Sequence, residues 1–239
     1  MKKTITLIGA LASLTGGAAA ELGGEAHAGY ATGYIFRGQD LGDHLFYGGI
    51  DGTYSGLFGM KSLSVNAGLW AATFDSSSVP GSTVYAEVDF FGSVSYDFGP
   101  VEAEAGYTYY LFDAEGLDSQ EAFFSLSSYC EALKTYFALA YFLDIRDQDN
   151  GGYLEGTAAR SFEINEKLAI DVEILAAYLI EEGNFSHLGA TVALPFQITD
   201  AITVSPYVAA TLELEGLKAV SPSNAENEFI GAVSVSAGF

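Results

Sequence analysis

Apolar residues alternate with polar or small residues along most of this chain, in runs of about ten residues. In Val101–Leu111 the odd positions hold Val, Ala, Tyr or Leu, and the even positions hold Glu, Gly, Thr or Tyr. Leu168–Ile180 and Ile202–Leu214 repeat this pattern. Because successive side chains of a β-strand point to opposite faces, a period of two predicts strands with one apolar face. The chain is therefore expected to fold as β-sheet.

Twelve such segments can be counted, beginning near residues 26, 44, 63, 83, 101, 121, 133, 153, 168, 185, 202 and 228. The connections between them alternate in length. The short ones are residues 99–100, 132–133, 165–167 and 199–201, and the longer ones are residues 39–43, 75–82, 114–119, 146–152 and 215–227. Short periplasmic turns and longer outer loops are typical of a membrane-spanning barrel with an even number of strands. The predicted fold class is all-β, a transmembrane antiparallel up-and-down β-barrel of about twelve strands. Residues 55–62 are long for a periplasmic turn, so ten strands are the alternative.

The N-terminal residues 1–20 have the features of a secretory signal peptide. These features are a positive start, a short apolar stretch and a small-residue cleavage site: Lys2, Lys3, Ile5–Leu14, Ala18 and Ala20. The alternative is an N-terminal core helix. No later segment offers the roughly 18 uninterrupted apolar residues of a membrane helix. We therefore expect a signal peptide at 1–20, a barrel at 21–239 and a location in the bacterial outer membrane.

The final residue, Phe239, lies in phase with the apolar face of the last segment. A terminal aromatic residue after alternating apolar residues resembles the sorting signal of outer-membrane barrels, and Phe239 is predicted to serve as that signal.

The chain is acidic, with 31 Asp and Glu against 9 Lys and Arg and a formal net charge of −22. This balance argues against a nucleic-acid partner, because phosphates are bound by basic groups. Cys130 is the single cysteine, and no Cys/His cluster indicates zinc. We expect no cofactor and no metal.

If the apolar phase faces lipid, the other phase lines the interior. Its predicted pore-lining residues are mostly acidic: Arg37, Asp51, Glu87, Asp89, Glu102, Glu104, Glu121, Asp144, Glu155, Asp171, Glu173 and Glu213. The basic residues of this phase are Arg37, Lys134 and Arg146. Carboxylates without cations need water, so a wet lumen is expected, and walls of Asp and Glu favour cations. Small interior residues such as Gly29, Gly49 and Gly106 also favour open space. The alternative is a lumen plugged by its own side chains and loops.

Arg37 has two interpretations. It could face Asp51 or another carboxylate across the lumen as a constriction residue. It could also pin the first strand to a neighbouring strand through an ion pair, since Arg binds carboxylates with two parallel hydrogen bonds.

The sequence does not indicate an enzyme. The three histidines are His27, His44 and His187, and Ser186 beside His187 is the one tempting pair. Adjacent residues of a strand point to opposite faces, so these two side chains should not meet. The predicted function is a porin-like channel for passive diffusion of small hydrophilic solutes, with cations preferred. The alternative is a non-conducting structural or surface-binding barrel. The expected partners are outer-membrane lipid, lipopolysaccharide, the barrel-assembly machinery and the solutes themselves.

The segments Tyr34–Gly38, Gly48–Asp51 and Ala67–Trp70 carry a family resemblance. They resemble the start of the TorF-type putative porins, in which an aromatic–x–aromatic–Arg–Gly motif precedes a Gly-rich strand and a Gly–x–Trp strand. The resemblance covers about the first fifty residues after the signal peptide and implies a pore-like outer-membrane protein with no assigned substrate. The loop Gln39–Asp43 departs from the family pattern, so no specificity is carried over.

Overall fold

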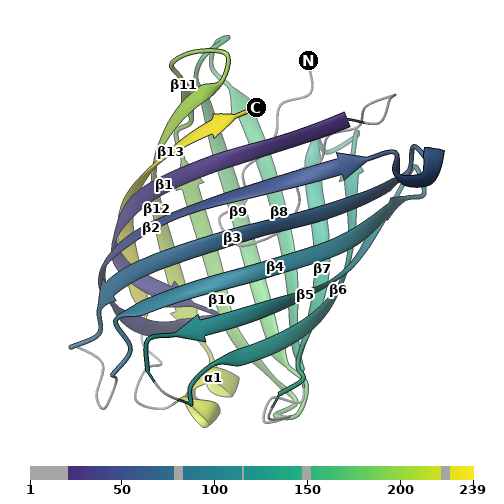
Figure 1. Ribbon diagram of the computed structural model, residues 1–239. Coiled ribbons are helices and arrows are strands. Elements are labelled where there is room, and N and C mark those ends of the chain that lie inside the picture. The colour runs from purple at the N-terminus through teal and green to yellow at the C-terminus, as the bar shows by residue number, and fades with distance from the viewer. Residues whose placement is uncertain (1–20, 78–82, 115, 147–151, 222–226) are drawn as a thin grey trace.

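The computed structural model describes residues 21–77, 83–114, 116–146, 152–221 and 227–239. In these residues the chain forms antiparallel strands that wrap into a barrel (Figure 1). The strands are β1 (Glu21–Phe36), β2 (Gln39–Ser55), β3 (Leu63–Asp75), β4 (Ala86–Asp97), β5 (Glu102–Phe112), β6 (Ser119–Cys130), β7 (Thr135–Asp144), β8 (Tyr153–Glu163), β9 (Ala169–Leu179), β10 (Asn184–Ala193), β11 (Phe196–Gln197), β12 (Ile202–Glu213) and β13 (Glu228–Gly238). Two short helices are η1 (Leu57–Gly59) and α1 (Glu215–Val220).

Each strand from β1 to β10 pairs with the next one in the chain, β12 pairs with β13, and two further pairings close the barrel. β1 closes against β13, with Tyr30 opposite Val233, and β10 pairs directly with β12, with Leu188 opposite Leu212. The two-residue β11 pairs only with the start of β12, so it does not count as a strand of the barrel wall. The fold is a closed antiparallel barrel of twelve strands, as predicted, and the ten-strand alternative is wrong. Residues 55–62, which raised that alternative, form a compact turn around η1 with Gly56 donating to the carbonyl of Leu63.

The connection between β1 and β2 differs from the prediction. The sequence predicts a loop at Gln39–Asp43, but these residues form the start of β2, and the turn consists of Arg37 and Gly38 alone. Both turn residues have positive φ, 51° for Arg37 and 82° for Gly38, as a two-residue hairpin turn requires. Asn-Gly is the usual sequence of such a turn, and Arg-Gly predicts a two-residue turn less strongly.

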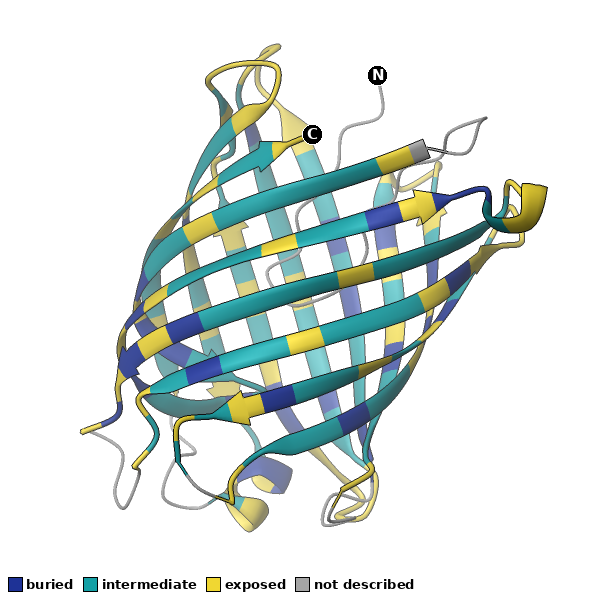
Figure 2. Cartoon of the chain, in the orientation of Figure 1, coloured by how far each residue is buried: buried dark blue, intermediate teal, exposed yellow. Residues whose placement is uncertain are grey.

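The two faces of the wall differ in polarity. Apolar side chains point outward and remain open to solvent in the isolated chain, for example Ile174 at 57% exposure and Leu139 at 48%. Polar side chains of the other phase are shielded, for example Glu121 at 4% and Ser125 at 2%. Buried residues form separate bands along the strands, set among intermediate and exposed residues (Figure 2). An apolar exterior around a polar interior matches the pattern of membrane-spanning barrels.

The barrel has two distinct ends. β1 begins and β13 ends at one of them, where the backbones of Gly24 and Phe239 exchange two hydrogen bonds of 3.0 Å. Helix α1 and the Arg37–Gly38 turn lie at the other end (Figure 1). In the orientation that places the termini in the periplasm, α1 and this turn are at the outer end. None of the helices in the described residues is both long and apolar enough to cross a membrane.

Two parts of the domain prediction stay predictions. The signal peptide at 1–20 lies outside the described residues. Phe239 is 68% exposed and follows the last strand, and its role as a sorting signal stays a prediction.

Candidate functional site: the barrel interior

The strand register places the predicted acidic residues on the interior face. Directly paired residues share a face, and Glu121 is paired with Asp144 on one side and Thr108 on the other. The same holds around the wall for Asp51, Glu87, Asp89, Glu102, Glu104, Glu155, Asp171, Glu173 and Glu213. Glu87, Glu104 and Glu121 are the most shielded, at 2%, 9% and 4% exposure.

Glu104 is held by neutral donors. Asn66 on β3 donates to Glu104 Oε1 at 3.3 Å and to Ser93 on β4 at 3.0 Å, and Ser93 donates in turn to Glu104. Thr53 on β2 completes the chain by donating to Asn66 at 2.7 Å. This polar ladder across β2–β5 orients the carboxylate without a cation, so its negative charge is not cancelled by these contacts.

Glu87 and Asp89 lie two residues apart on the same face of β4. Tyr34 of β1 donates to Glu87 Oε2 at 2.7 Å. Asp89 Oδ1 is buried, and the carboxyl groups of Asp89 and Glu87 lie within hydrogen-bonding contact of each other on the inner wall.

Arg37 forms an ion pair in the interior that is surrounded by aromatic rings. Its guanidinium forms two hydrogen bonds with Glu121 on β6, and that between Nη2 and Oε2 measures 2.6 Å. Tyr110 also donates to Glu121, at 2.8 Å. The guanidinium lies over the rings of Phe142 and Tyr153, at 4.5 and 4.7 Å from their centroids.

The side chain of Arg37 is only 14% exposed. Burial alone would lower the pKa of Arg37, but the hydrogen bonds and charge of Glu121 more than offset this, and the net pKa is raised. Arg37 therefore carries a permanent charge. Its partner is neither Asp51 nor a residue on an adjacent strand: the ion pair crosses the interior to β6.

The other basic residues assigned to the interior phase lie elsewhere. Lys134 is in the exposed turn after β6, and Arg146 is exposed just beyond β7. Lys218 of α1, which was not singled out from the sequence, contacts Glu213 at 2.9 Å.

Aromatic rings fill space that the sequence pattern assigned to open lumen. Tyr47 lies directly opposite Gly29, and a Cβ on Gly29 would come within 2.5 Å of the Tyr47 ring. Phe123 covers Gly106 on the adjacent strand in the same way, and the His27 ring lies 2.8 Å from where a Cβ of Gly49 would be. The expectation that these glycines leave open space is wrong, because each one accommodates a ring from a neighbouring strand.

Ser186 and His187 also differ from expectation. Their side chains are hydrogen-bonded at 3.1 Å, and both are buried, at 1% and 4% exposure. The pairing of β9 with β10 shifts register between Phe185 and Leu188, and such a bulge breaks the alternation on which the prediction depended.

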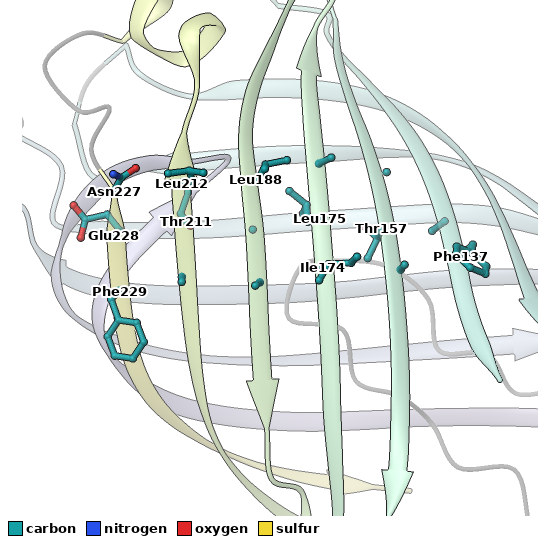
Figure 3. A pocket seen from close by; sticks show the side chains of 17 residues that line it. Phe137, Thr157, Ile174, Leu175, Leu188, Thr211, Leu212, Asn227, Glu228 and Phe229 are labelled. Carbon is teal, nitrogen blue, oxygen red and sulfur yellow. The ribbon is translucent and has the colours of Figure 1, made fainter. Parts of the chain in front are cut away.

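An apolar hollow of about 950 Å³ lies on the outward face of the wall, over β7–β10, β12 and β13 (Figure 3). Its floor consists of small residues such as Gly156, Ala176 and Ala190, and larger side chains, Phe137, Leu188 and Phe229 among them, surround it. This hollow faces the lipid side and is separate from the interior. Within the described residues no group of three or more His, Cys, Asp and Glu is arranged to hold a metal ion.

Comparisons with known proteins support the architecture. No family model matches the chain, and no curated protein matches it. Among solved structures it is similar to an outer-membrane channel from Pseudomonas putida F1, with a TM-score of 0.59 and 7% identity over 98% of this chain and 100% of that chain. It is also similar to the KdgM porin, with a TM-score of 0.54 and 9% identity over 91% and 99% of the two chains. The NanC porin has a TM-score of 0.54 and 11% identity over 90% and 98%.

At these identities the likeness shows the fold alone. The chain has the twelve-strand fold of bacterial porins and channels, and its wall has the apolar exterior that such barrels present to lipid. This architecture indicates the bacterial outer membrane.

Proposed function

We propose that this barrel is a channel for passive diffusion of small hydrophilic solutes, with a preference for cations. The observation that carries the proposal is the polarity of the interior: carboxylates on β2, β4–β9 and β12 share one face, and Arg37 is neutralised by Glu121. A surface of one charge sign inside a narrow passage concentrates ions of the opposite sign. The similar structures named porins or channels support the conducting function. The KdgM porin has also been solved in complex with a disordered oligogalacturonate, so a barrel of this fold binds a hydrophilic oligosaccharide.

The test is planar-bilayer conductance of the refolded chain 21–239 under a salt gradient. Discrete channels with a cation-selective reversal potential are expected. The double variant Glu102→Gln/Glu104→Gln should lower that selectivity, since it removes two carboxylates from one wall. The matched control is Glu131→Gln/Glu166→Gln, which removes two acids from exposed turns.

Anion selectivity of the unmodified barrel would overturn the cation preference. A folded barrel that never conducts would overturn the channel and favour the alternative, a structural or surface-binding barrel. That alternative has one observation in its favour, which is the aromatic packing over the interior glycines.

The remaining expectations belong to the same proposal. Outer-membrane lipid and lipopolysaccharide would cover the apolar exterior, and the barrel-assembly machinery would insert the chain, with Phe239 as the sorting signal. Kinship with the TorF-type porins is proposed on the segments Tyr34–Gly38, Gly48–Asp51 and Ala67–Trp70.

A further inference from the structure

The tip of the β1–β2 hairpin, residues 34–41, lies inside the barrel. In the wall, β1 and β2 are bordered by β13 and β3. The tip also contacts strands farther around the barrel: Tyr34 donates a hydrogen bond to Glu87 on β4, and Arg37 donates to Glu121 on β6. Arg37 also lies over Tyr153 of β8. A single short turn can reach β4, β6 and β8 together only by crossing the interior.

The backbone shows how the tip leaves the wall. Backbone pairing of β1 with β13 ends at Ala31, and beyond it Thr32 Oγ1 accepts a hydrogen bond from the backbone of Gly231 at 3.0 Å. The β1–β2 register shifts between Tyr34 and Ile35, and the β2–β3 register shifts between Asp43 and Phe46. Bulges bend strands and redirect side chains, and here they lie on both flanks of the tip.

The far side of the tip is closely packed. A Cβ on Gly38 would lie 2.7 Å from the His187 ring on β10 and 3.0 Å from Leu217 of α1. Leu217 is 1% exposed, so the helix covers this contact. Phe36 packs edge-on against Tyr110 of β5 at 5.9 Å between ring centroids. The tip is thus surrounded by β4, β5, β6, β8, β10 and α1.

We propose that the hairpin tip is the constriction of the outer mouth and that the Arg37–Glu121 ion pair holds it in place. The inference rests on the channel function proposed above and adds the element that limits its width. Two parallel hydrogen bonds between charged groups, enclosed by aromatic rings, form the strongest single contact of the tip. Without this contact one buried charge of the pair has no opposite charge beside it, and the tip should move out of the lumen.

The first test compares single-channel conductance of the unmodified barrel with that of Glu121→Gln and Arg37→Glu. Both variants should conduct more, by about twofold or more, because a wider path carries more ions. The charge-swapped variant Arg37→Glu/Glu121→Arg should return toward the unmodified value. Lys61→Gln is the control, because it removes a cation from an exposed turn at the opposite end of the barrel. If the unmodified barrel conducts and the pair variants match it, the constriction is refuted while the channel stands.

The second test does not need conductance. Trypsin added to the outer side of proteoliposomes should cleave after Arg37 in Glu121→Gln, giving a fragment that begins at Gly38. The unmodified barrel and Lys61→Gln should resist cleavage there, because the tip is buried. Equal cleavage in all three would overturn the inference.

A third variant separates the two proposals. Replacing residues 35–41 by Asn-Gly joins Tyr34 to Gly42, which are already paired, through a two-residue turn. This barrel lacks the tip and should conduct most. If neither it nor the unmodified barrel conducts, the channel function fails, and the trypsin result alone decides where the tip lies.

Discussion

Gly38 and His187 are separated by 149 positions in the chain, yet the imidazole occupies the space where a Cβ of Gly38 would stand, 2.7 Å from its ring atoms. Gly38 also has a φ of 82°, which other residues adopt at a cost. Position 38 therefore excludes a side chain for two independent reasons, the backbone conformation and the contact with β10.

Gly38→Ala should lower the stability of the barrel by about 1–3 kcal/mol, from backbone strain and steric overlap together. The measurement is the temperature at which the folded band is lost in a heat-modifiability gel. Gly59→Ala separates the two causes, because Gly59 has a similar φ of 78° and no atom within 4 Å of its Cβ position. Equal losses in the two variants would mean that the contact with His187 contributes nothing.

Leu139→Arg should destabilise the barrel in a bilayer by about 2–4 kcal/mol, the cost of a charge at mid-depth on the lipid face. Leu139 is 48% exposed on the outward face of β7. Folding yield into vesicles under urea titration reports this change. Ala138→Arg, one residue away on the interior face, should cost less and should alter selectivity instead. The reverse order would mean that the two faces are assigned the wrong way round.

Asn66→Ala removes the amide that links Thr53, Ser93 and Glu104. A buried polar group that loses its partner costs about 1–3 kcal/mol, so the urea midpoint of unfolding should fall by a corresponding amount. Asn165→Ala is the comparison, since Asn165 makes its hydrogen bonds in an exposed turn. A midpoint unchanged by Asn66→Ala would show that the ladder adds no stability.

Cation selectivity should fall as the pH is lowered, because each interior carboxylate that takes up a proton loses its charge. Reversal potentials measured at about pH 8 and about pH 3 span the range in which carboxyl groups ordinarily titrate, since the ordinary pKa values of Asp and Glu are about 3.9 and 4.3. The Glu102→Gln/Glu104→Gln variant should change less over the same interval, since it has fewer groups to titrate. A reversal potential independent of pH would exclude carboxylates as the source of selectivity.

The order of strands could be predicted from the sequence, because alternation is a local property of each segment. Predicted starts near residues 63, 153, 202 and 228 coincide with the starts of β3, β8, β12 and β13. The hairpin tip could not be predicted in this way. Its position depends on Glu121, 84 residues away, and on bulges that change which face a side chain occupies. Ser186 and His187 were misplaced for the same reason, since the bulge between Phe185 and Leu188 interrupts the alternation.

Aromatic rings that pack over glycines on adjacent strands constrain the register in which those strands can pair. Tyr47 faces Gly29, Phe91 faces Gly68 and Phe123 faces Gly106, each across one pair of adjacent strands. In each pair the ring occupies the Cβ position of its glycine, so it fits only where a side chain is missing. A strand that slipped by two residues would keep its apolar residues on the same face, so polarity alone does not prevent that shift. In the shifted register each ring would overlap with a side chain in place of a glycine, and this steric overlap would destabilise the misaligned barrel.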